Sequence, residues 1–309
     1  MNRFYRKDTT LSIVLFAIIF VFISCGSDEV TQDNSTDGSS DNPVEDPAPS
    51  FADINFSNWK VTLPVDENND GKPDEYKPKD LMDFGYQSLN SVKPFMYDDT
   101  DDTSLVFYTY QGGATTANSN YPRTELRELI VPDNSKINWT LKDGGELKGK
   151  LKVTEVSVDN DTNNDYHYVI VMQIHGIISV QDMQTHGFSS NNGPPLIKIY
   201  WKDGYVWSHK KSLVNESTEG DDLLSTSSSI WSDIKVNLGY VGYESFDFRI
   251  TASDAKIEVQ LNTNEPYVYE DVSLEKWPFE NYFKAGNYLT TLDPNAYSYV
   301  KYYNLEVTH

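Results

Sequence analysis

Cysteine is almost absent from this chain of 309 residues, in which Cys25 is the only one. No intramolecular disulfide can form, so a hydrophobic core must stabilise the fold. Basic residues are also few, with 25 Lys and Arg against 47 Asp and Glu and a net charge of −22. Such an acidic surface excludes nucleic acid as a partner. It also repels acidic polysaccharides, so a site for one requires a local concentration of positive charge.

A long apolar run is missing near the N-terminus as well. Residues 11–23 are apolar, but these 13 residues fall short of the roughly 20 that a membrane-spanning helix needs. A basic start precedes the run, and Ser24-Cys25-Gly26, which ends it, resembles a bacterial lipobox. We therefore predict a lipoprotein signal peptide over residues 1–24. Acylated Cys25 would anchor the chain to the bacterial cell envelope, by preference to the outer membrane, with the rest of the chain outside the cytoplasm; an uncleaved helical anchor is the alternative.

The remaining chain divides into a short polar segment and one long domain. Residues 25–50 are rich in Ser, Asp, Thr, Pro and Asn, with almost nothing apolar. They cannot bury enough surface to offset the entropy of ordering, so we predict a flexible tether. Residues 51–309 are ample for one large domain with its own core.

Alternating apolar and polar residues dominate this domain, in short stretches separated by Gly, Asn, Asp and Pro. Val, Ile, Tyr, Phe and Thr are frequent in the stretches, as in half-buried strands. Helical patterns are rare, with short candidates at 79–84 and 273–277. Many strands in one domain predict an all-β fold, an antiparallel sandwich or jelly roll. The expected strands are 104–111, 146–158, 166–177, 196–209, 246–250, 256–262 and 297–307.

An acidic turn between Asp66 and Gly71 has the spacing of the first half of a calcium-binding loop. Lys77 stands where a bidentate Glu would complete the loop. A polar surface turn is therefore favoured, and we predict no metal site. A structural calcium between Asp66 and Asp70 is the alternative.

A first segment places charged side chains on one face of an expected strand. Arg123, Glu125 and Arg127 alternate with Thr124 and Leu126, so the three charged residues share a face. Two guanidiniums beside one carboxylate can hold sugar carboxylates in bidentate fashion. Taken alone, this segment is better explained as a solvated, salt-bridged outer face.

A second and a third segment add groups suited to proton transfer and sugar binding. Gln173 and His175 share a face of an apolar strand, where an imidazole can act as a general base near neutral pH. A single histidine is more often structural. In the third segment, Tyr282, Lys284 and Tyr288 share a face, and a cation between two phenols suits a sugar groove. A weaker fourth segment places Lys198 and Tyr200 together.

The three segments together resemble polysaccharide lyase family 7. Its alginate lyases carry Arg-x-Glu-Leu-Arg, Gln-Ile/Val-His and Tyr-Phe-Lys-Ala-Gly-x-Tyr motifs in this order. Here they begin at Arg123, Gln173 and Tyr282. Asn-Trp-Lys-Val-Thr-Leu-Pro from Asn58 also looks like the family's first strand, so the resemblance extends over residues 51–309. After Tyr288 the chain has Leu-Thr where Asn-Gln is often found, which puts contacts to the substrate in doubt.

The resemblance implies a concanavalin-like β-jelly roll of two curved antiparallel sheets whose groove cleaves the 1,4-glycosidic bonds of alginate by β-elimination. The product carries an unsaturated uronate at its new non-reducing end. Arg123, Gln173 and His175 would neutralise the substrate carboxylate, and Tyr288 would protonate the leaving oxygen. The base would be His175 for guluronate and Tyr288 for mannuronate, and no metal or cofactor is required. The residues implied to position neighbouring sugars are Glu125, Arg127, Lys198, Tyr282 and Lys284.

Two other classes of protein compete with this interpretation. A glycoside hydrolase needs two carboxylates at acid and base spacing, and the chain has no Glu-x-Asp-x-x-Glu segment. A non-catalytic glycan-binding protein has no chemical need to keep Gln173, His175 and Tyr288 together. We therefore predict a monomeric alginate lyase whose partner is alginate and which contacts membranes only through its lipid anchor. In the family that the chain resembles, Ile at the position of Ile174 tends to accompany cutting at guluronate or mixed blocks, so the resemblance implies this substrate preference. The loops 178–195 and 214–229 decide between internal and terminal cutting.

Overall fold

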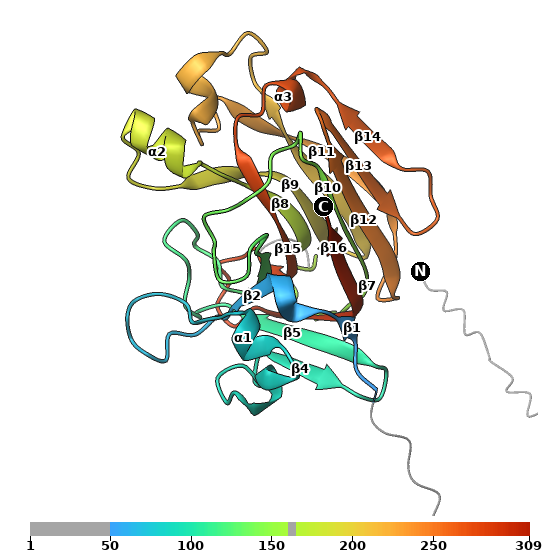
Figure 1. Ribbon diagram of the computed structural model, residues 1–309. Helices are drawn as coiled ribbons and strands as arrows, with labels where there is room; N and C mark the ends of the chain where they lie inside the picture. Colours follow the sequence, from blue (N-terminus) through green and yellow to red (C-terminus); the bar gives the residue numbers. More distant parts are fainter. Residues whose placement is uncertain (1–49, 160–164) are drawn as a thin grey trace, which may run out of the picture. The chain divides into compact units, whose positions relative to one another are not determined.

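The structure, a computed structural model, describes residues 50–159 and 165–309 (Figure 1). The predicted signal peptide, Cys25 and all but the last residue of the predicted tether lie outside the described residues. Two eight-stranded sheets make up most of the described chain. Among the described residues, no helix is long and apolar enough to cross a membrane. The expectation of an all-β jelly roll is confirmed.

The first sheet has the strand order β14-β13-β12-β7-β16-β5-β4, with β1 paired to β16. That last pairing is parallel, and every other pairing in this sheet is antiparallel. Its strands are β14 (Tyr267–Glu270), β13 (Lys256–Leu261), β12 (Phe246–Ser253), β7 (Gly145–Val156), β16 (Tyr297–Thr308), β5 (Ser104–Tyr110), β4 (Met96–Asp99) and β1 (Asp53–Ile54).

The second sheet, which carries the candidate site, has the order β11-β10-β9-β8-β15-β6-β2-β3 and is antiparallel throughout. Its strands are β11 (Trp231–Tyr240), β10 (Tyr205–Leu213), β9 (Asn192–Lys202), β8 (Val169–Ile177), β15 (Glu280–Leu289), β6 (Arg123–Glu128), β2 (Trp59–Thr62) and β3 (Glu75–Tyr76). The short helices are α1 (Pro78–Leu81), α2 (Val180–His186), α3 (Val272–Glu275), η1 (Phe56–Asn58), η2 (Gly85–Ser88) and η3 (Gly220–Leu224).

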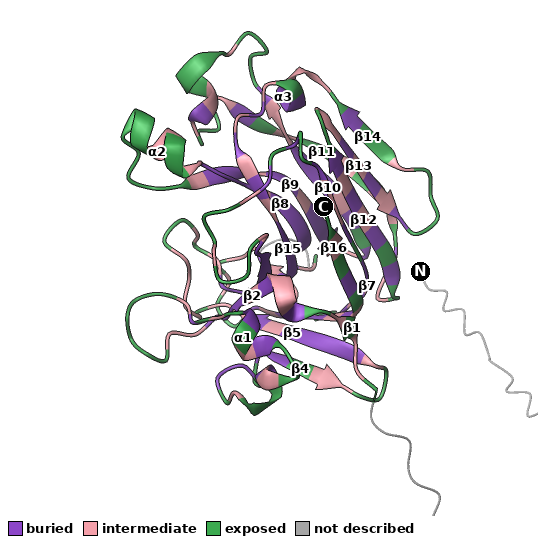
Figure 2. Ribbon diagram, viewed as in Figure 1, coloured by how far each residue is buried: buried purple, intermediate pink, exposed green. Residues whose placement is uncertain are grey.

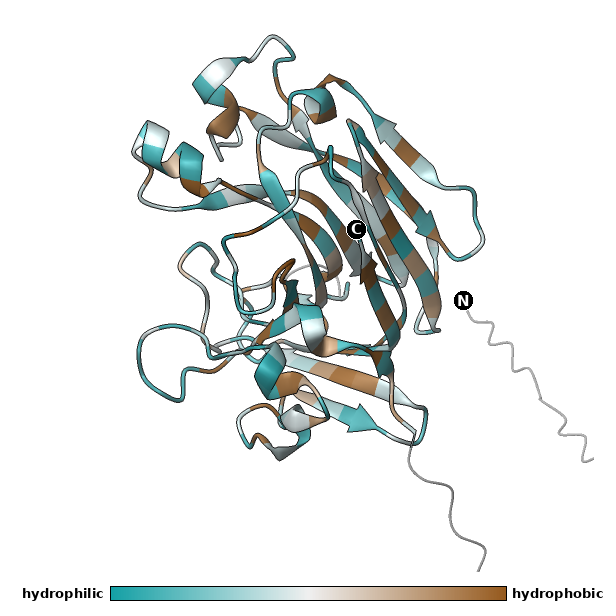
Figure 3. Cartoon of the chain, viewed as in Figure 1, coloured by the Kyte–Doolittle hydropathy of each residue, from teal (hydrophilic) through white to brown (hydrophobic). Residues whose placement is uncertain are grey.

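The core lies between the sheets and follows the period-two pattern of the strands. In β12, Phe248 and Ile250 are buried, whereas Asp247 is exposed and Arg249 is half-buried. The same alternation of apolar and polar residues is visible along the strands in Figure 3, and buried residues line the strands in Figure 2. Strand β8 differs, because its residues are buried on both faces apart from His175. The face of β8 that points away from the core is therefore covered by other parts of the protein.

Buried hydrogen bonds join the two sheets directly beneath the third segment. The hydroxyl of Tyr302 on β16 donates to the carbonyl oxygen of Val171 on β8 at 2.5 Å. It also accepts from the backbone N–H of Gly286 on β15 at 3.1 Å. The amide of Asn287 donates to the carbonyl oxygens of Phe107 and Ser298 at 2.9 and 2.8 Å. Strand β15 is therefore fixed from below at the point where it carries Lys284 and Tyr288 on the opposite face.

One expected strand proves wrong in its bounds. The stretch 196–209 is not a single strand but parts of β9 and β10, which are joined by a tight turn at Asp203 and Gly204. Both turn residues have positive φ, 51° and 80°, as a two-residue hairpin turn requires. The stretch expected to be a loop at 178–195 contains α2 and the start of β9, and the stretch at 214–229 contains η3.

Candidate active site

A groove of about 860 Å³ lies over the second sheet and is lined by residues from all eight of its strands. Eight of the nine residues predicted to act on the sugar chain line it, so the three segments meet as the family resemblance implied. These eight are Arg123, Arg127, Gln173, His175, Lys198, Tyr282, Lys284 and Tyr288. The ninth, Glu125, is 1% exposed and lies beneath them.

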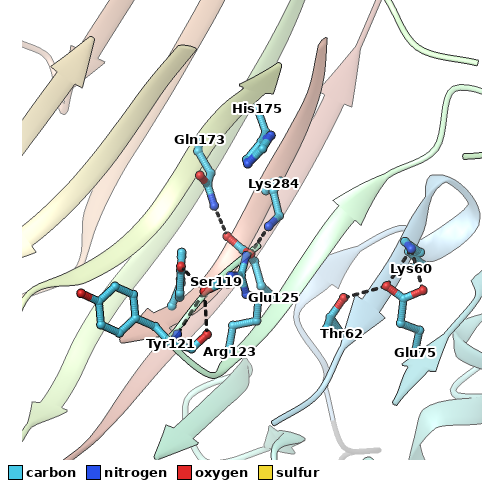
Figure 4. A network of polar contacts seen from close by, with 12 residues as sticks. Lys60, Thr62, Glu75, Ser119, Tyr121, Arg123, Glu125, Gln173, His175 and Lys284 are labelled. Carbon is cyan, nitrogen blue, oxygen red and sulfur yellow. Dashed lines mark hydrogen bonds and ion pairs between the residues drawn. The ribbon is translucent and has the colours of Figure 1, made fainter. Parts of the chain in front are cut away.

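Glu125 is the centre of a buried polar network in the groove floor (Figure 4). Gln173 donates from Nε2 to its Oε1 at 2.5 Å. Oε2 accepts from Arg123 Nη1 at 3.3 Å and forms an ion pair with Lys284 Nζ. A carboxylate this deeply buried requires such partners. It holds the three donors close together beneath the groove surface.

The sequence led us to expect that Arg123 and Arg127 flank Glu125, and half of this expectation is wrong. The second cation beside the carboxylate is Lys284, which is the cross-strand neighbour of Arg127. Arg127 instead donates to the carbonyl oxygens of Glu128 and Ser135 at 2.5 and 3.0 Å, and to Asn138 Oδ1 at 2.7 Å. Its guanidinium carbon lies 4.2 Å from the ring centre of Tyr282. Because its terminal nitrogens are occupied by the protein, Arg127 is placed to position Tyr282.

His175 is arranged to remain neutral. Its Nδ1 lies 2.9 Å from the carbonyl oxygen of Gly176, which can only accept, so Nδ1 carries the proton and Nε2 keeps a lone pair. The ring stacks on Tyr282, with centres 5.3 Å apart and planes 13° apart. Desolvation at the base of the groove, together with the charge of Lys284, lowers the pKa of His175 to about 3. The imidazole is therefore available as a base at neutral pH.

Tyr288 lies beside Arg123, its direct neighbour across β15 and β6. The guanidinium carbon of Arg123 lies 3.8 Å from the ring centre of Tyr288. The phenol oxygen lies 2.7 Å from Ser119 Oγ, and the ring of Tyr121 lies 6.2 Å away. The stack fixes the plane of the phenol, and the phenol oxygen stays within hydrogen-bonding distance of Ser119 Oγ.

Close backbone approach explains the glycine in the third segment. Gly286 has a φ of 141°, and a Cβ atom there would lie 2.6 Å from the carbonyl oxygen of Thr124 on the neighbouring strand. The register of β15 against β8 also shifts between Ala285 and Tyr288. Only glycine fits this bulge, which sets the position of Tyr288 relative to Lys284.

Several groove residues were missed by the sequence analysis. His209 and Lys211 on β10, Asp233 and Lys235 on β11, and the pair formed by Lys60 and Glu75 line the groove as well. Treating 196–209 as one strand hid the first two, because the side-chain parity restarts after a hairpin turn. The signal that could have found them is the Asp-Gly turn at 203–204, which predicts a second strand whose odd-numbered residues face the groove.

Two clusters elsewhere contain groups that bind metals in other proteins. In the acidic turn, the carboxylate of Asp66 accepts from the backbone N–H groups of Asp70 and Gly71 at 3.0 and 2.9 Å, as in a hydrogen-bonded surface turn. Asp159, His167 and Asp293 bring three potential ligand atoms within 4.8 Å of one another. None of these residues lines the groove, so neither cluster belongs to the candidate site.

Comparison with known proteins agrees with the fold and the groove. A family model described as alginate lyase matches residues 54–309. An alginate lyase of Klebsiella pneumoniae is 28% identical over 297 residues, covering 82% of this chain and 89% of the relative. The crystal structure of alginate lyase A1-II', a member of polysaccharide lyase family 7, is 27% identical and has a TM-score of 0.62, covering 83% of this chain and 96% of that one. A variant of A1-II' in complex with the substrate GGMG is 26% identical, with a TM-score of 0.61 and coverage of 82% and 93%.

A jelly roll whose groove gathers cations, a neutral histidine and a phenol on one sheet defines a polysaccharide lyase. The matches span the described domain, including the strands that carry all three segments. The chain belongs to the alginate lyases of polysaccharide lyase family 7.

The pH dependence of kcat/KM is expected to have two unusual limits. Since the pKa of His175 is lowered to about 3, the imidazole stays unprotonated well below the ordinary histidine value of about 6.5, and activity is expected to persist at mildly acidic pH. Burial lowers the pKa of Lys284 to about 8, so activity falls as pH rises through this value and the cation is lost. A profile measured on alginate tests both limits.

The variant Lys284→Arg separates the alkaline limit from other causes. Arginine stays protonated up to a pH of about 12, so the fall near pH 8 should disappear in the variant if it reports on residue 284. An alkaline limb that is unchanged in Lys284→Arg contradicts the assignment. The acid limit assigned to His175 is tested in the same way. The assignment is contradicted if the parent loses activity near the ordinary pKa of histidine and this loss is absent from His175→Ala.

Proposed function

We propose that Arg123 and Gln173 donate to the carboxylate of the uronate that is cut, and that Tyr288 protonates the leaving oxygen. His175 assists beside them as a neutral imidazole, with its Nε2 lone pair free to accept a proton. The C5 proton of a uronate is poorly acidic while the adjacent carboxylate keeps its full negative charge. Donors fixed in place by the Glu125 network can stabilise the enolate-like charge that develops, since they need no reorganisation during the reaction. Removal of one such donor typically lowers the rate by about 10²–10³-fold.

The charge of the groove is the observation that carries this function. Seven Lys and Arg side chains line the groove against two carboxylates, Glu75 and Asp233, although the chain as a whole has a net charge of −22. This is the local concentration of positive charge that an acidic polysaccharide requires on an acidic protein. The cations surround a neutral imidazole and a phenol, which adds proton-transfer chemistry to binding.

The base is assigned by the stereochemistry of the substrate. In guluronate the C5 proton and the leaving group lie on opposite sides, so two groups are needed, and we assign His175 as base and Tyr288 as acid. In mannuronate they lie on the same side, where Tyr288 can serve both steps. A metal ion or cofactor is not required for this chemistry, because Arg123 and Lys284 supply the positive charge. Elimination that survives chelation of divalent metals is the expected result.

We infer a preference for guluronate or mixed blocks. Ile174 lies between Gln173 and His175 and is fully buried in the core, so it acts on the groove only through the backbone of β8. A variant of the relative A1-II' is in complex with the mixed substrate GGMG. Purified polyguluronate, polymannuronate and mixed blocks test the preference, with cleavage of polyguluronate and mixed blocks expected to be faster. Cleavage of polymannuronate alone contradicts it.

We also infer that the enzyme works at the cell envelope as a lipoprotein. The support is the sequence around Cys25, which resembles a lipobox after a basic start and a short apolar run. Mass spectrometry of the protein from the membrane fraction is expected to find an acylated Cys25 at its N-terminus. Recovery of Cys25→Ala in the same membrane fraction as the parent protein contradicts the inference.

A further inference from the structure

A single row of polar side chains crosses the groove sheet at right angles to its strands. Each member comes from a different strand, from β2 at one end to β11 at the other, and each is the direct cross-strand neighbour of the next. All of them line the groove. This polar row consists of Lys60, Arg127, Lys284, Gln173, Lys198, His209 and Lys235.

The polar row extends well past the catalytic residues on the β11 side. Adjacent strands lie about 4.8 Å apart, so His209 and Lys235 lie about two and three strand spacings, or roughly 10 and 14 Å, from Gln173 along the row. The spacing of about 4.8 Å between adjacent strands is close to the rise of one sugar residue in an extended 1,4-linked chain. A polyuronate that crosses the strands can therefore place successive sugar residues over successive members of the row.

His209 is an unused polar group in this outer part of the groove. It is 8% exposed, and its ring packs on that of Tyr200 with centres 4.4 Å apart. Within residues 50–159 and 165–309, its ring nitrogens form no hydrogen bond, although the residue lines the groove. Desolvation and the charge of Lys198 lower the pKa of His209 to about 4, so the ring is a neutral hydrogen-bonding group.

The charges around His209 are not balanced. Three lysines, Lys198, Lys211 and Lys235, surround it with a single carboxylate, that of Asp233. Asp233 pairs with two of them, at 2.9 Å from Lys211 Nζ and 3.9 Å from Lys198 Nζ. Lys235 forms no ion pair with any residue of the described chain. Positive charge next to an unpartnered, neutral hydrogen-bonding group is the arrangement that a carboxylate ligand completes.

We propose that Lys198, His209 and Lys235 form a distal subsite that binds the carboxylate of a uronate two to three sugar residues from the point of cleavage, on the β11 side. This subsite rests on the proposed function of the groove and adds to it a residue-level basis for chain-length preference. Because it is remote from the reacting bond, it contributes to binding of long chains and leaves kcat unchanged.

Reversal of one charge tests the distal subsite, since Lys235 is exposed and its substitution leaves the core intact. Lys235→Glu is compared with Lys79→Glu, which makes the same charge change at an exposed residue of α1 outside the groove. Elimination is measured on polymer and on defined uronate trimers and hexamers. For Lys235→Glu, KM for the hexamer and the polymer is expected to rise about 10-fold, which corresponds to about 1.4 kcal/mol, while the trimer and kcat change little.

His209→Gln serves as a second variant, with thermal unfolding to confirm that it is folded, and the same selective rise in KM is expected. Equal effects on trimer and hexamer, or effects no larger than those of Lys79→Glu, overturn the subsite while the proposed function stands. If the parent protein eliminates no uronate at all, the proposed function fails instead. In that case the subsite is tested by binding alone, with alginate polymer and the folded parent and Lys235→Glu proteins. The subsite is overturned if Lys235→Glu binds the polymer as tightly as the parent does.

Discussion

Tyr288→Phe is expected to lower kcat by about 10²–10⁴-fold, the usual contribution of general acid and base catalysis. Phenylalanine keeps the stack on the Arg123 guanidinium, which lies 3.8 Å from the ring centre. The substitution removes only the hydroxyl, whose protein partner is Ser119 Oγ at 2.7 Å. Because binding of the sugar carboxylates does not use this hydroxyl, KM should change little. The ultraviolet absorbance of the unsaturated uronate measures the rate.

A matched control is available in the same wall of the groove. Tyr121 also lines the groove and lies next to Tyr288, with ring centres 6.2 Å apart. Tyr121→Phe removes an identical hydroxyl, but from a residue with no assigned role in proton transfer, so kcat should stay close to that of the parent. Near-parental kcat in Tyr288→Phe, or an equal loss in Tyr121→Phe, contradicts the assignment of the acid.

Glu125→Gln is expected to lower the free energy of unfolding by about 3–5 kcal/mol, as for other broken buried ion pairs. The glutamine has the same shape but no charge. It leaves Arg123 and Lys284, which are 8% and 6% exposed, close together without their shared carboxylate. Gln173 also loses its charged acceptor. Chemical denaturation measures the loss, and activity should fall with it because the donors that bind the substrate are no longer fixed.

The ion pair of Lys60 and Glu75 is the matched control, since it lies on the same face of the same sheet (Figure 4). Lys60 Nζ lies 2.7 Å from Glu75 Oε2, but the Glu75 side chain is 44% exposed. Water screens such a pair, so Glu75→Gln should lower the free energy of unfolding by less than about 1 kcal/mol. Similar losses in the two variants would show that Glu125 does not organise the groove.

Side-chain parity explains how much of the site could be predicted from the sequence. Alternation fixes which residues share a face, and the structure places Arg123, Gln173, His175, Lys284 and Tyr288 in one groove. The order of neighbouring strands is not contained in such patterns. It came instead from the resemblance to a family, whose fold implies that the three segments lie side by side.

Pairing across strands explains what could not be predicted. That Lys284, rather than Arg127, neighbours the Glu125 carboxylate depends on the register of β15 against β6 and on the bulge after Ala285. His209 and Lys211 escaped notice because the two-residue turn at 203–204 was missed, and with it the start and the parity of β10. The position of a bulge or turn depends on local backbone geometry that composition does not reveal.

The most direct test of the central claim is the chemistry of the product that the parent protein forms from alginate. Elimination predicts oligosaccharides that absorb in the ultraviolet and whose masses are one water molecule lower than those of hydrolysis products, with both signals lost in Tyr288→Phe. New reducing ends without the unsaturated uronate would show that the groove hydrolyses its substrate, and would contradict the assignment of His175 and Tyr288 as the base and acid of a β-elimination.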